Sequence, residues 1–169
     1  MKAVANNPRG RWSRRAGFSL IELLIVVAII LIIAAIAIPS LLKAHISANE
    51  ASAVTSVHSV VTGELIYSTL YPTIGNSALL SDLGPGAVSP CPGTSTASCI
   101  IDVSVAGGQK SGYNFTYTQD ASSVPSPGYK INADPMSRSV SGQRSYYADQ
   151  TNVTRVNPTA VAGPGDPPL

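Results

Sequence analysis

Arg14-Arg15-Ala16-Gly17-Phe18-Ser19-Leu20-Ile21-Glu22-Leu23 leads into an apolar run that extends from Phe18 to Ile38, and Glu22 is the single charged residue within that run. As an α-helix, these 21 residues would extend about 31 Å, close to the thickness of a bilayer's hydrocarbon core. An isolated carboxylate inside a membrane costs about 2.5 to 3.5 kcal/mol to insert, so Glu22 is a candidate functional residue. The alternative is that Glu22 lies near the membrane surface, neutral or reaching water.

Gly17 is followed by Phe18-Ser19-Leu20-Ile21-Glu22-Leu23-Leu24, stands behind a basic leader and precedes an apolar run that ends in Ile38-Pro39. This arrangement resembles the class III signal of type IV pilins and type II secretion pseudopilins. The resemblance implies that a prepilin peptidase cleaves between Gly17 and Phe18, that the new amino terminus of Phe18 is N-methylated, and that the chain polymerises through its apolar helix. It also implies that Glu22 sets the register between subunits.

Positive charge is concentrated at the amino terminus. The leader, residues 1–17, holds five of the eleven basic residues and none of the nine acidic ones, so the rest of the chain has six basic and nine acidic residues and a net charge of −3. Positive residues beside a membrane segment stay on the cytoplasmic side. The asymmetry predicts a single-pass protein whose bulk lies outside the cytoplasm, and it favours a topology signal over a nucleic-acid-binding patch. The resemblance implies that the membrane is the inner membrane. The basic leader residues are Lys2, Arg9, Arg11, Arg14 and Arg15.

The two cysteines, Cys91 and Cys99, fit a compartment in which disulfides persist. Seven residues that include Pro92-Gly93 separate them, enough to turn the chain and close a small loop. A metal site would need further ligands nearby, and neither histidine is close in sequence. The spacing favours a disulfide, with two free, small apolar cysteines as the alternative.

The helical pattern extends well beyond the apolar run. Pro39 would remove a backbone hydrogen bond and kink the helix, but no proline occurs between Leu41 and Leu70, so we expect a bend with continuation rather than a helix that stops. The sequence predicts a helix over 18–70, with a transmembrane or assembly half at 18–38 and an amphipathic half at 39–70. Apolar residues in the second half recur at spacings of three and four, which is typical of one buried helix face: Ile46, Ala53, Val54, Val57, Val60, Val61 and Leu65.

Four ionisable residues lie on the predicted amphipathic half. His45 and His58 are 13 residues apart, and at about 100° per residue they lie on widely separated faces, so they cannot share a metal ion. Both histidines are expected to face solvent or an interface. Glu50 and Glu64 are expected to be solvated.

Tyr71-Pro72 ends the predicted helix, because a residue before proline is disfavoured in the helical conformation. Residues 71–112 are rich in Gly, Pro, Ser and Thr and are expected to form a connecting loop with the cysteines and one short helical turn at 79–83. Apolar and polar residues then alternate, which predicts an antiparallel sheet of three or four strands over 113–156. The expected strands are 113–118, 129–132, 144–148 and 152–156.

The buried stripe of the long helix would cover the apolar face of this sheet, which predicts an α+β fold. The last segment, 157–169, contains four prolines and little to bury, so it is expected to be a flexible tail.

Motifs for catalysis are not found in the sequence. It contains no phosphate-binding glycine loop, no paired His and Cys cluster and no nucleophile elbow. Asp134, Asp149 and Asp166 could supply oxygen ligands to calcium, but their spacing matches no known loop signature. We therefore expect no enzyme activity, no cofactor and no metal.

The leading hypothesis is a structural subunit of a filament that is stored in the inner membrane and polymerises through its first helix. Its expected partners are copies of itself, other pilins, the prepilin peptidase and a pilus or type II secretion assembly platform, and its final location is a cell-surface pilus or a periplasmic pseudopilus. One alternative is a membrane-anchored binding domain that never polymerises. Another is a secreted domain cut after Ala35-Ile36-Ala37, although the apolar run is longer than the hydrophobic region of a secretory signal peptide.

Overall fold

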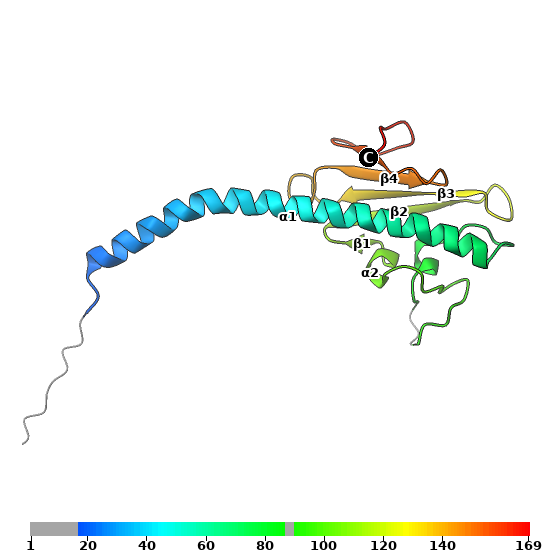
Figure 1. Cartoon of the computed structure of the whole chain (residues 1–169), viewed down its shortest axis with the longest axis horizontal. Helices are drawn as coiled ribbons and strands as arrows, with labels where there is room; N and C mark the ends of the chain where they lie inside the picture. Colours follow the sequence, from blue (N-terminus) through cyan, green and yellow to red (C-terminus); the bar gives the residue numbers. More distant parts are fainter. Residues whose placement is uncertain (1–16, 87–89) are drawn as a thin grey trace, which may run out of the picture. The chain divides into compact units, whose positions relative to one another are not determined.

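A computed structural model of the chain describes residues 17–86 and 90–169 (Figure 1). The chain divides into two compact units, Met1–Pro39 and Ser40–Leu169. The basic leader predicted at 1–17 lies outside the described residues, with the exception of Gly17.

The long helix α1 extends from Leu20 to Leu70 and comprises 51 residues. Its first backbone bond is donated by the Leu23 N–H to the Ser19 carbonyl, at 3.3 Å. Pro39 lies inside the helix, which continues on both sides of it. The predicted long helix is therefore confirmed and begins two residues later than expected, whereas the kink at Pro39 stays a prediction.

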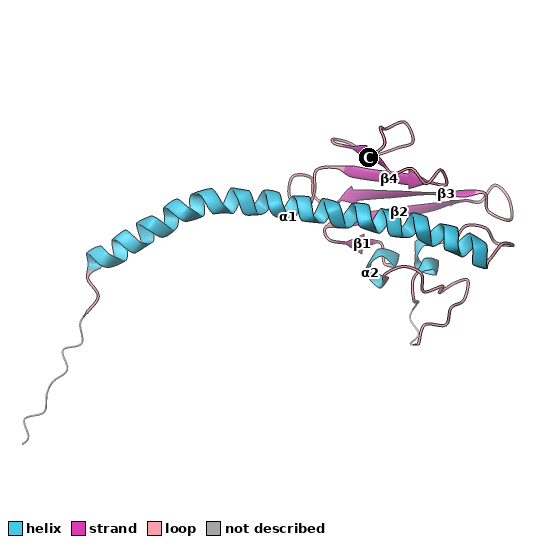
Figure 2. Cartoon of the chain, in the orientation of Figure 1, coloured by secondary structure: helices cyan, strands magenta, loops and turns pink. Residues whose placement is uncertain are grey.

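Five antiparallel strands form a single sheet in the order β1-β2-β3-β4-β5 (Figure 2). Each strand pairs with its neighbour in sequence. The α+β fold is confirmed, but the sheet has five strands rather than the three or four predicted. The unpredicted strand is β1, which is two residues long and too short to show an alternating pattern. The strands are β1 Gln109–Lys110, β2 Tyr113–Asp120, β3 Gly128–Pro135, β4 Ser145–Asp149 and β5 Arg155–Asn157.

The second part of α1 packs on the sheet through the predicted stripe. Val57 and Val60 are fully buried in one core with residues of β2 and β3 such as Phe115 and Ile131. Leu65 does not belong to this face, because it is 61% exposed. Tyr67 is buried in its place, since it lies three residues beyond position 64 and continues the spacing of the stripe.

Two short elements lie between α1 and the sheet. The 3₁₀ turn η1, Leu80–Leu83, occurs where a helical turn is predicted. The helix α2, Val103–Ala106, is not predicted by the sequence. Asp102 caps its amino terminus, because the Asp102 side chain accepts a hydrogen bond from the Ser104 N–H at 2.8 Å. Both elements bury a residue in the core, Leu83 and Val105.

Residues 157–169 fold back on the sheet. Asn132 Nδ2 donates to the Ala162 carbonyl at 2.6 Å, and the Val156 N–H donates to the Pro167 carbonyl at 3.0 Å. Ala162 is the one buried residue of this segment, which therefore has little to bury, as expected, and backbone carbonyls rather than large apolar side chains make its contacts. Its flexibility stays a prediction.

Candidate functional site

The first half of α1 exposes its apolar side chains. The most apolar window of α1 has no buried residue, and among the described residues this is the one helix that could cross a membrane by its length and composition. Phe18 and Leu20 are 81% and 80% exposed, and every other large apolar residue up to Leu42 is exposed as well. Apolar surface on this scale requires lipid or other apolar helices around it.

The predicted cleavage junction lies just before α1. Gly17, Phe18 and Ser19 are exposed and not helical. A Cβ atom added to Gly17 would meet no atom within 4 Å, so nothing in the described chain obstructs this residue. The junction therefore has the accessible, non-helical backbone that a protease requires.

Glu22 lies in the first turn of α1, where its Oε2 accepts a hydrogen bond from the Ser19 N–H at 3.1 Å. This bond is one half of a capping box, in which the residue at the third helical position caps the residue before the helix. A negative charge is also favoured at a helix amino terminus. The pattern Ser19-Leu20-Ile21-Glu22 carries this signal in the sequence, so Glu22 has a local structural role beside the one predicted for it.

The structure joins Cys91 and Cys99 in a disulfide, which confirms the predicted pairing. The Cα atoms of the two cysteines are 6.3 Å apart. Two tyrosine hydroxyls near the end of α1 bind the enclosed loop: Tyr67 donates to the Ser95 carbonyl at 2.8 Å, and Tyr71 donates to the Gly93 carbonyl at 3.0 Å. The loop is thus fixed to α1 as well as closed on itself.

Glu50 is buried, at 6% exposure, so the expectation that it is solvated is wrong. Its Oε1 accepts the backbone N–H groups of Gln143 and Arg144 at 2.9 and 3.1 Å, and its Oε2 accepts Arg144 Nε at 2.8 Å. Arg144 Nη2 lies 2.7 Å from the same oxygen. Burial alone would raise the pKa of Glu50, but these hydrogen bonds outweigh it and hold the pKa below its usual value.

Glu64 is 1% exposed, so the expectation of a solvated side chain is wrong here too. Its Oε1 accepts the hydroxyls of Ser77 and Tyr117 at 2.5 and 2.6 Å, and its Oε2 accepts the Ser77 N–H at 3.0 Å. These donors are neutral, and burial raises the pKa of Glu64 despite them. The two glutamates thus fasten α1 to distant parts of the chain by different chemistry.

His45 and His58 are exposed, as predicted. The described residues contain no group of three His, Cys, Asp or Glu side chains able to hold a metal ion. Asp166 is engaged locally, because its Oδ2 accepts the Gly163 N–H at 2.8 Å and its Oδ1 accepts Asn157 Nδ2 at 3.0 Å.

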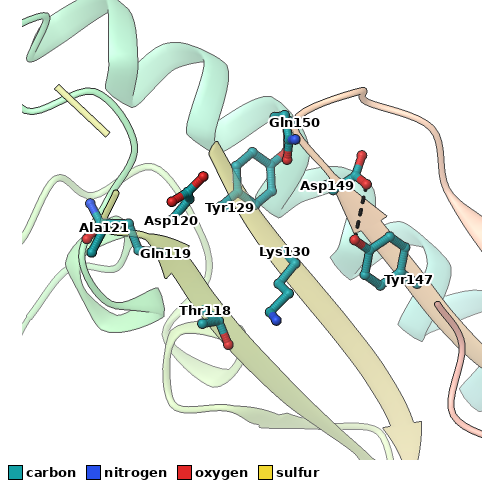
Figure 3. A pocket seen from close by; sticks show the side chains of 9 residues that line it. All are labelled: Thr118, Gln119, Asp120, Ala121, Tyr129, Lys130, Tyr147, Asp149 and Gln150. Atoms are coloured by element: carbon teal, nitrogen blue, oxygen red, sulfur yellow. Dashed lines mark hydrogen bonds between the residues drawn. The ribbon is translucent and has the colours of Figure 1, made fainter. Parts of the chain in front are cut away.

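A cavity of about 360 Å³ lies at one end of strands β2, β3 and β4. Figure 3 shows Lys130 between the side chains of Thr118 and Tyr147, with its head group directed away from Asp120 and Asp149. Tyr147 donates its hydroxyl to Asp149 Oδ2 at 3.1 Å. The cavity is polar and open, and its lining brings together no recognisable catalytic group.

Comparison with known proteins identifies the amino-terminal segment. Residues 12–38 match the family model of the prokaryotic N-terminal methylation motif. This motif is the prepilin signal of type IV pilins and pseudopilins, a structural rather than enzymatic class, so the chain carries the signal of that class. No curated protein and no solved structure matches the chain.

The motif implies processing by a prepilin peptidase and assembly into filaments, and with the apolar helix it points to anchoring in a membrane. The motif is common to pili and type II secretion pseudopili. The match ends at residue 38, so the connecting loop, the disulfide and the sheet lie outside it.

Proposed function

We propose that the chain is a structural subunit of a type IV pilus-like filament, stored in the inner membrane and polymerised through the first half of α1. The observation that carries the proposal is the uncovered apolar surface from Phe18 to Leu42, directly after a prepilin signal. Lipid surrounds this surface in the monomer, and helices of neighbouring subunits surround it in the filament. Such a head-to-tail contact does not close on itself and therefore generates a fibre.

Glu22 has the role of setting the register in this proposal. Cleavage after Gly17 creates a positive amine on Phe18, and Glu22 follows four residues later in the first turn of α1. In the apolar core of a filament, the amine of a neighbouring subunit beside Glu22 would relieve two desolvated charges together. This pairing is possible at one axial offset between subunits and so selects that offset.

The first test is mass spectrometry of the natural amino terminus. A methylated Phe18 is expected for a filament subunit. An uncut leader would instead indicate an anchored domain that does not polymerise, and a terminus after Ala37 would indicate a secreted domain. Either of these two results would contradict the proposal.

The second test separates the register role of Glu22 from its capping role. Glu22→Gln keeps an oxygen that can cap Ser19, as glutamine does in capping boxes, but removes the charge. We expect Glu22→Gln and Glu22→Ala both to insert and to be cleaved, yet to assemble poorly, whereas Glu22→Asp should be intermediate. Filament yield and helical rise are measured by electron microscopy. Normal filaments from Glu22→Gln would show that assembly needs only the capping hydrogen bond and not the charge of Glu22. Normal filaments from Glu22→Ala would show that apolar packing alone sets the register.

A second candidate function is that of a type II secretion pseudopilin. The observation in its favour is Tyr71-Pro72-Thr73, directly after α1, which resembles major pseudopilins. The residues that follow depart from the pseudopilin pattern, and the disulfide-spaced cysteines favour a pilin. Immuno-electron microscopy distinguishes the two candidates: labelled filaments on the cell surface favour the pilus. A subunit confined to the periplasm, whose deletion stops secretion of other proteins, favours the pseudopilus.

A further inference from the structure

The turn that joins β3 to β4 exposes apolar side chains on a well-braced backbone. Val140 and Met136 are 61% and 47% exposed, although polar residues and glycine are usual in turns. The turn is closed on itself, because the N–H groups of Val140 and Ser141 both donate to the Ser137 carbonyl, at 3.2 and 2.9 Å. The fold itself therefore holds the two apolar side chains in solvent.

Side-chain hydrogen bonds attach the same turn to the sheet and to α1. Arg138 donates its Nη1 to the Gln143 carbonyl at 2.6 Å and its Nη2 to Ser145 Oγ, at the start of β4, at 2.7 Å. Asn49 of α1 donates its Nδ2 to the Ser141 carbonyl at 2.9 Å. The turn thus lies beside α1 at the level of Asn49.

The side of α1 that carries the turn leads back to Leu42 and Lys43. Residues seven apart on an α-helix point in nearly the same direction, since two helical turns comprise about 7.2 residues. Leu42 therefore lies on the same face as Asn49, and Lys43 on the same face as Glu50, each about 10 Å earlier along the axis. Leu42 is 50% exposed, and no carboxylate in the described part of the chain lies within salt-bridge distance of Lys43.

Leu42 and Lys43 lie close to the expected boundary of the membrane. The apolar run ends at Ile38, and the two residues follow within about 8 Å along the helix axis. The polar headgroup layer adds about 5 to 7 Å to each side of the hydrocarbon core, so both residues reach this layer when α1 crosses a bilayer. Membrane helices are tilted by about 20° on average, and a tilt toward the turn brings its apolar side chains onto the headgroups.

We propose that the surface formed by Leu42, Lys43, Met136 and Val140 docks on the phospholipid headgroups of the membrane in which the chain is stored. Met136 and Val140 insert between the headgroups, and the Lys43 ammonium binds their phosphate groups, since an anionic membrane surface attracts nearby basic residues. Lipid is favoured over a protein partner because the surface is continuous with the apolar residues that end at Leu42. The inference rests on the membrane anchoring in the proposed function and does not depend on polymerisation.

The test measures how close a single tryptophan comes to the membrane surface. The full chain is reconstituted into vesicles of phosphatidylcholine and phosphatidylglycerol, some of which carry a nitroxide quencher on the headgroup. Trp12, the one tryptophan of the chain, is replaced by phenylalanine, and the probe is introduced as Val140→Trp. Val124→Trp is the matched control, because Val124 is 87% exposed in the turn between β2 and β3, at the other end of β3. We expect strong quenching of Val140→Trp and weak quenching of Val124→Trp.

A second pair of variants tests the cation. Lys43→Gln, combined with Val140→Trp, should shift the equilibrium between docked and free turns about fivefold toward the free turn, the contribution of one basic residue at an anionic surface. Lys130→Gln removes an exposed lysine near the start of β3 and should leave the quenching unchanged. Met136 is the one methionine beyond the leader, and hydrogen peroxide should oxidise it more slowly in the wild type than in Lys43→Gln in the same vesicles.

Equal quenching of Val140→Trp and Val124→Trp would overturn the proposal, and so would quenching that Lys43→Gln leaves unchanged. Protection of Met136 that persists in detergent and increases with protein concentration would also overturn it, because a second copy would then cover the surface. Sedimentation with the vesicles after an alkaline wash shows for each variant that α1 is inserted. A turn that fails to dock on an inserted chain contradicts this inference alone, whereas a chain that fails to insert contradicts the anchoring in the proposed function.

Discussion

Replacement of Glu50 by alanine should clearly destabilise the unit Ser40–Leu169. Glu50 accepts three hydrogen bonds from Gln143 and Arg144 in addition to its ion pair with Arg144 Nη2. These contacts join α1 to the chain that leads into β4. Glu50→Ala leaves two backbone N–H groups and one guanidinium without their acceptor.

The expected loss follows from the exposure of the two partners. Removing one member of a buried ion pair costs about 3 to 5 kcal/mol. The Arg144 side chain is 45% exposed and Glu50 is nearly covered, so water can rehydrate the arginine, and we expect a loss of about 2 to 3 kcal/mol in the free energy of unfolding. For a unit of this size, such a loss corresponds to a decrease in Tm of about 8 to 12 °C.

The loss of unfolding free energy in Glu50→Ala should depend on pH. The pKa of Glu50 in the folded chain lies below its ordinary value of 4.5, so its stabilising contribution is fully present above about pH 4.5 and is lost as the pH falls through the folded pKa. The difference in unfolding free energy between wild type and Glu50→Ala should therefore be constant from about pH 7 to about pH 5 and then decrease on further acidification.

The assay is thermal and urea unfolding of the full chain in micelles, followed by near-ultraviolet circular dichroism of the buried tyrosines. Ser47→Ala, a change at an exposed position one turn earlier on the same helix, is the control and should alter the unfolding free energy by less than about 0.5 kcal/mol. A Glu50→Ala variant as stable as this control would refute the reasoning. A stability difference that stays constant down to about pH 3 would refute the assigned ionic contribution.

Three further predictions concern the disulfide, Glu64 and the leader. Reduction of Cys91–Cys99 should lower the free energy of unfolding by about 2 to 3 kcal/mol and leave the far-ultraviolet signal of α1 unchanged; alkylation of two free thiols in the natively localised protein would contradict the bond. The raised pKa of Glu64 means that its protonated form is favoured in the fold, so the contribution of this residue to stability should fall as the pH rises through the folded pKa. Glu64→Gln should remove that component of the pH profile, and an unchanged profile would argue against it. Gly17→Val should block processing and leave a longer, leader-bearing protein on immunoblots, because cleavage requires an unobstructed residue there; normal processing would refute the assigned junction.

The sequence predicts the parts of the fold that have a long, regular pattern. The apolar run and the stripe around Val57 and Val60 predict α1, and the alternation from Tyr113 onwards predicts β2. The helix α2 and strand β1 are four and two residues long, too short for a period to appear. The helix α2 packs against η1 and β1, and β1 pairs with β2, so their positions depend on contacts that only the folded chain provides.

The buried glutamates show a different limit of sequence reasoning. Positions 50, 53, 57, 60, 64 and 67 follow the alternating spacing of three and four that defines one helix face, and all six residues are buried. Glu50 and Glu64 therefore lie on the face that covers the sheet. The spacing alone is enough to place both residues on the buried face, but charged side chains are usually solvated. The donors that satisfy the two carboxylates lie up to 94 residues away in sequence, so the local pattern does not reveal them.

The two glutamate contacts also decide how the chain would carry tension. In the proposed filament, subunits are held by the first half of α1, and a pulling force on the exposed surface must pass through the contacts between α1 and the sheet. Glu50 and Glu64 lie on the same helix about four turns apart, so the load is shared between an ionic attachment and a neutral one. Protonation at low pH weakens the contacts of Glu50, whereas it removes the cost of burying a charge at Glu64, since the pKa values of the two residues are displaced in opposite directions. The subunit would thus keep one sound attachment under mechanical stress on either side of the usual pKa of a carboxyl group.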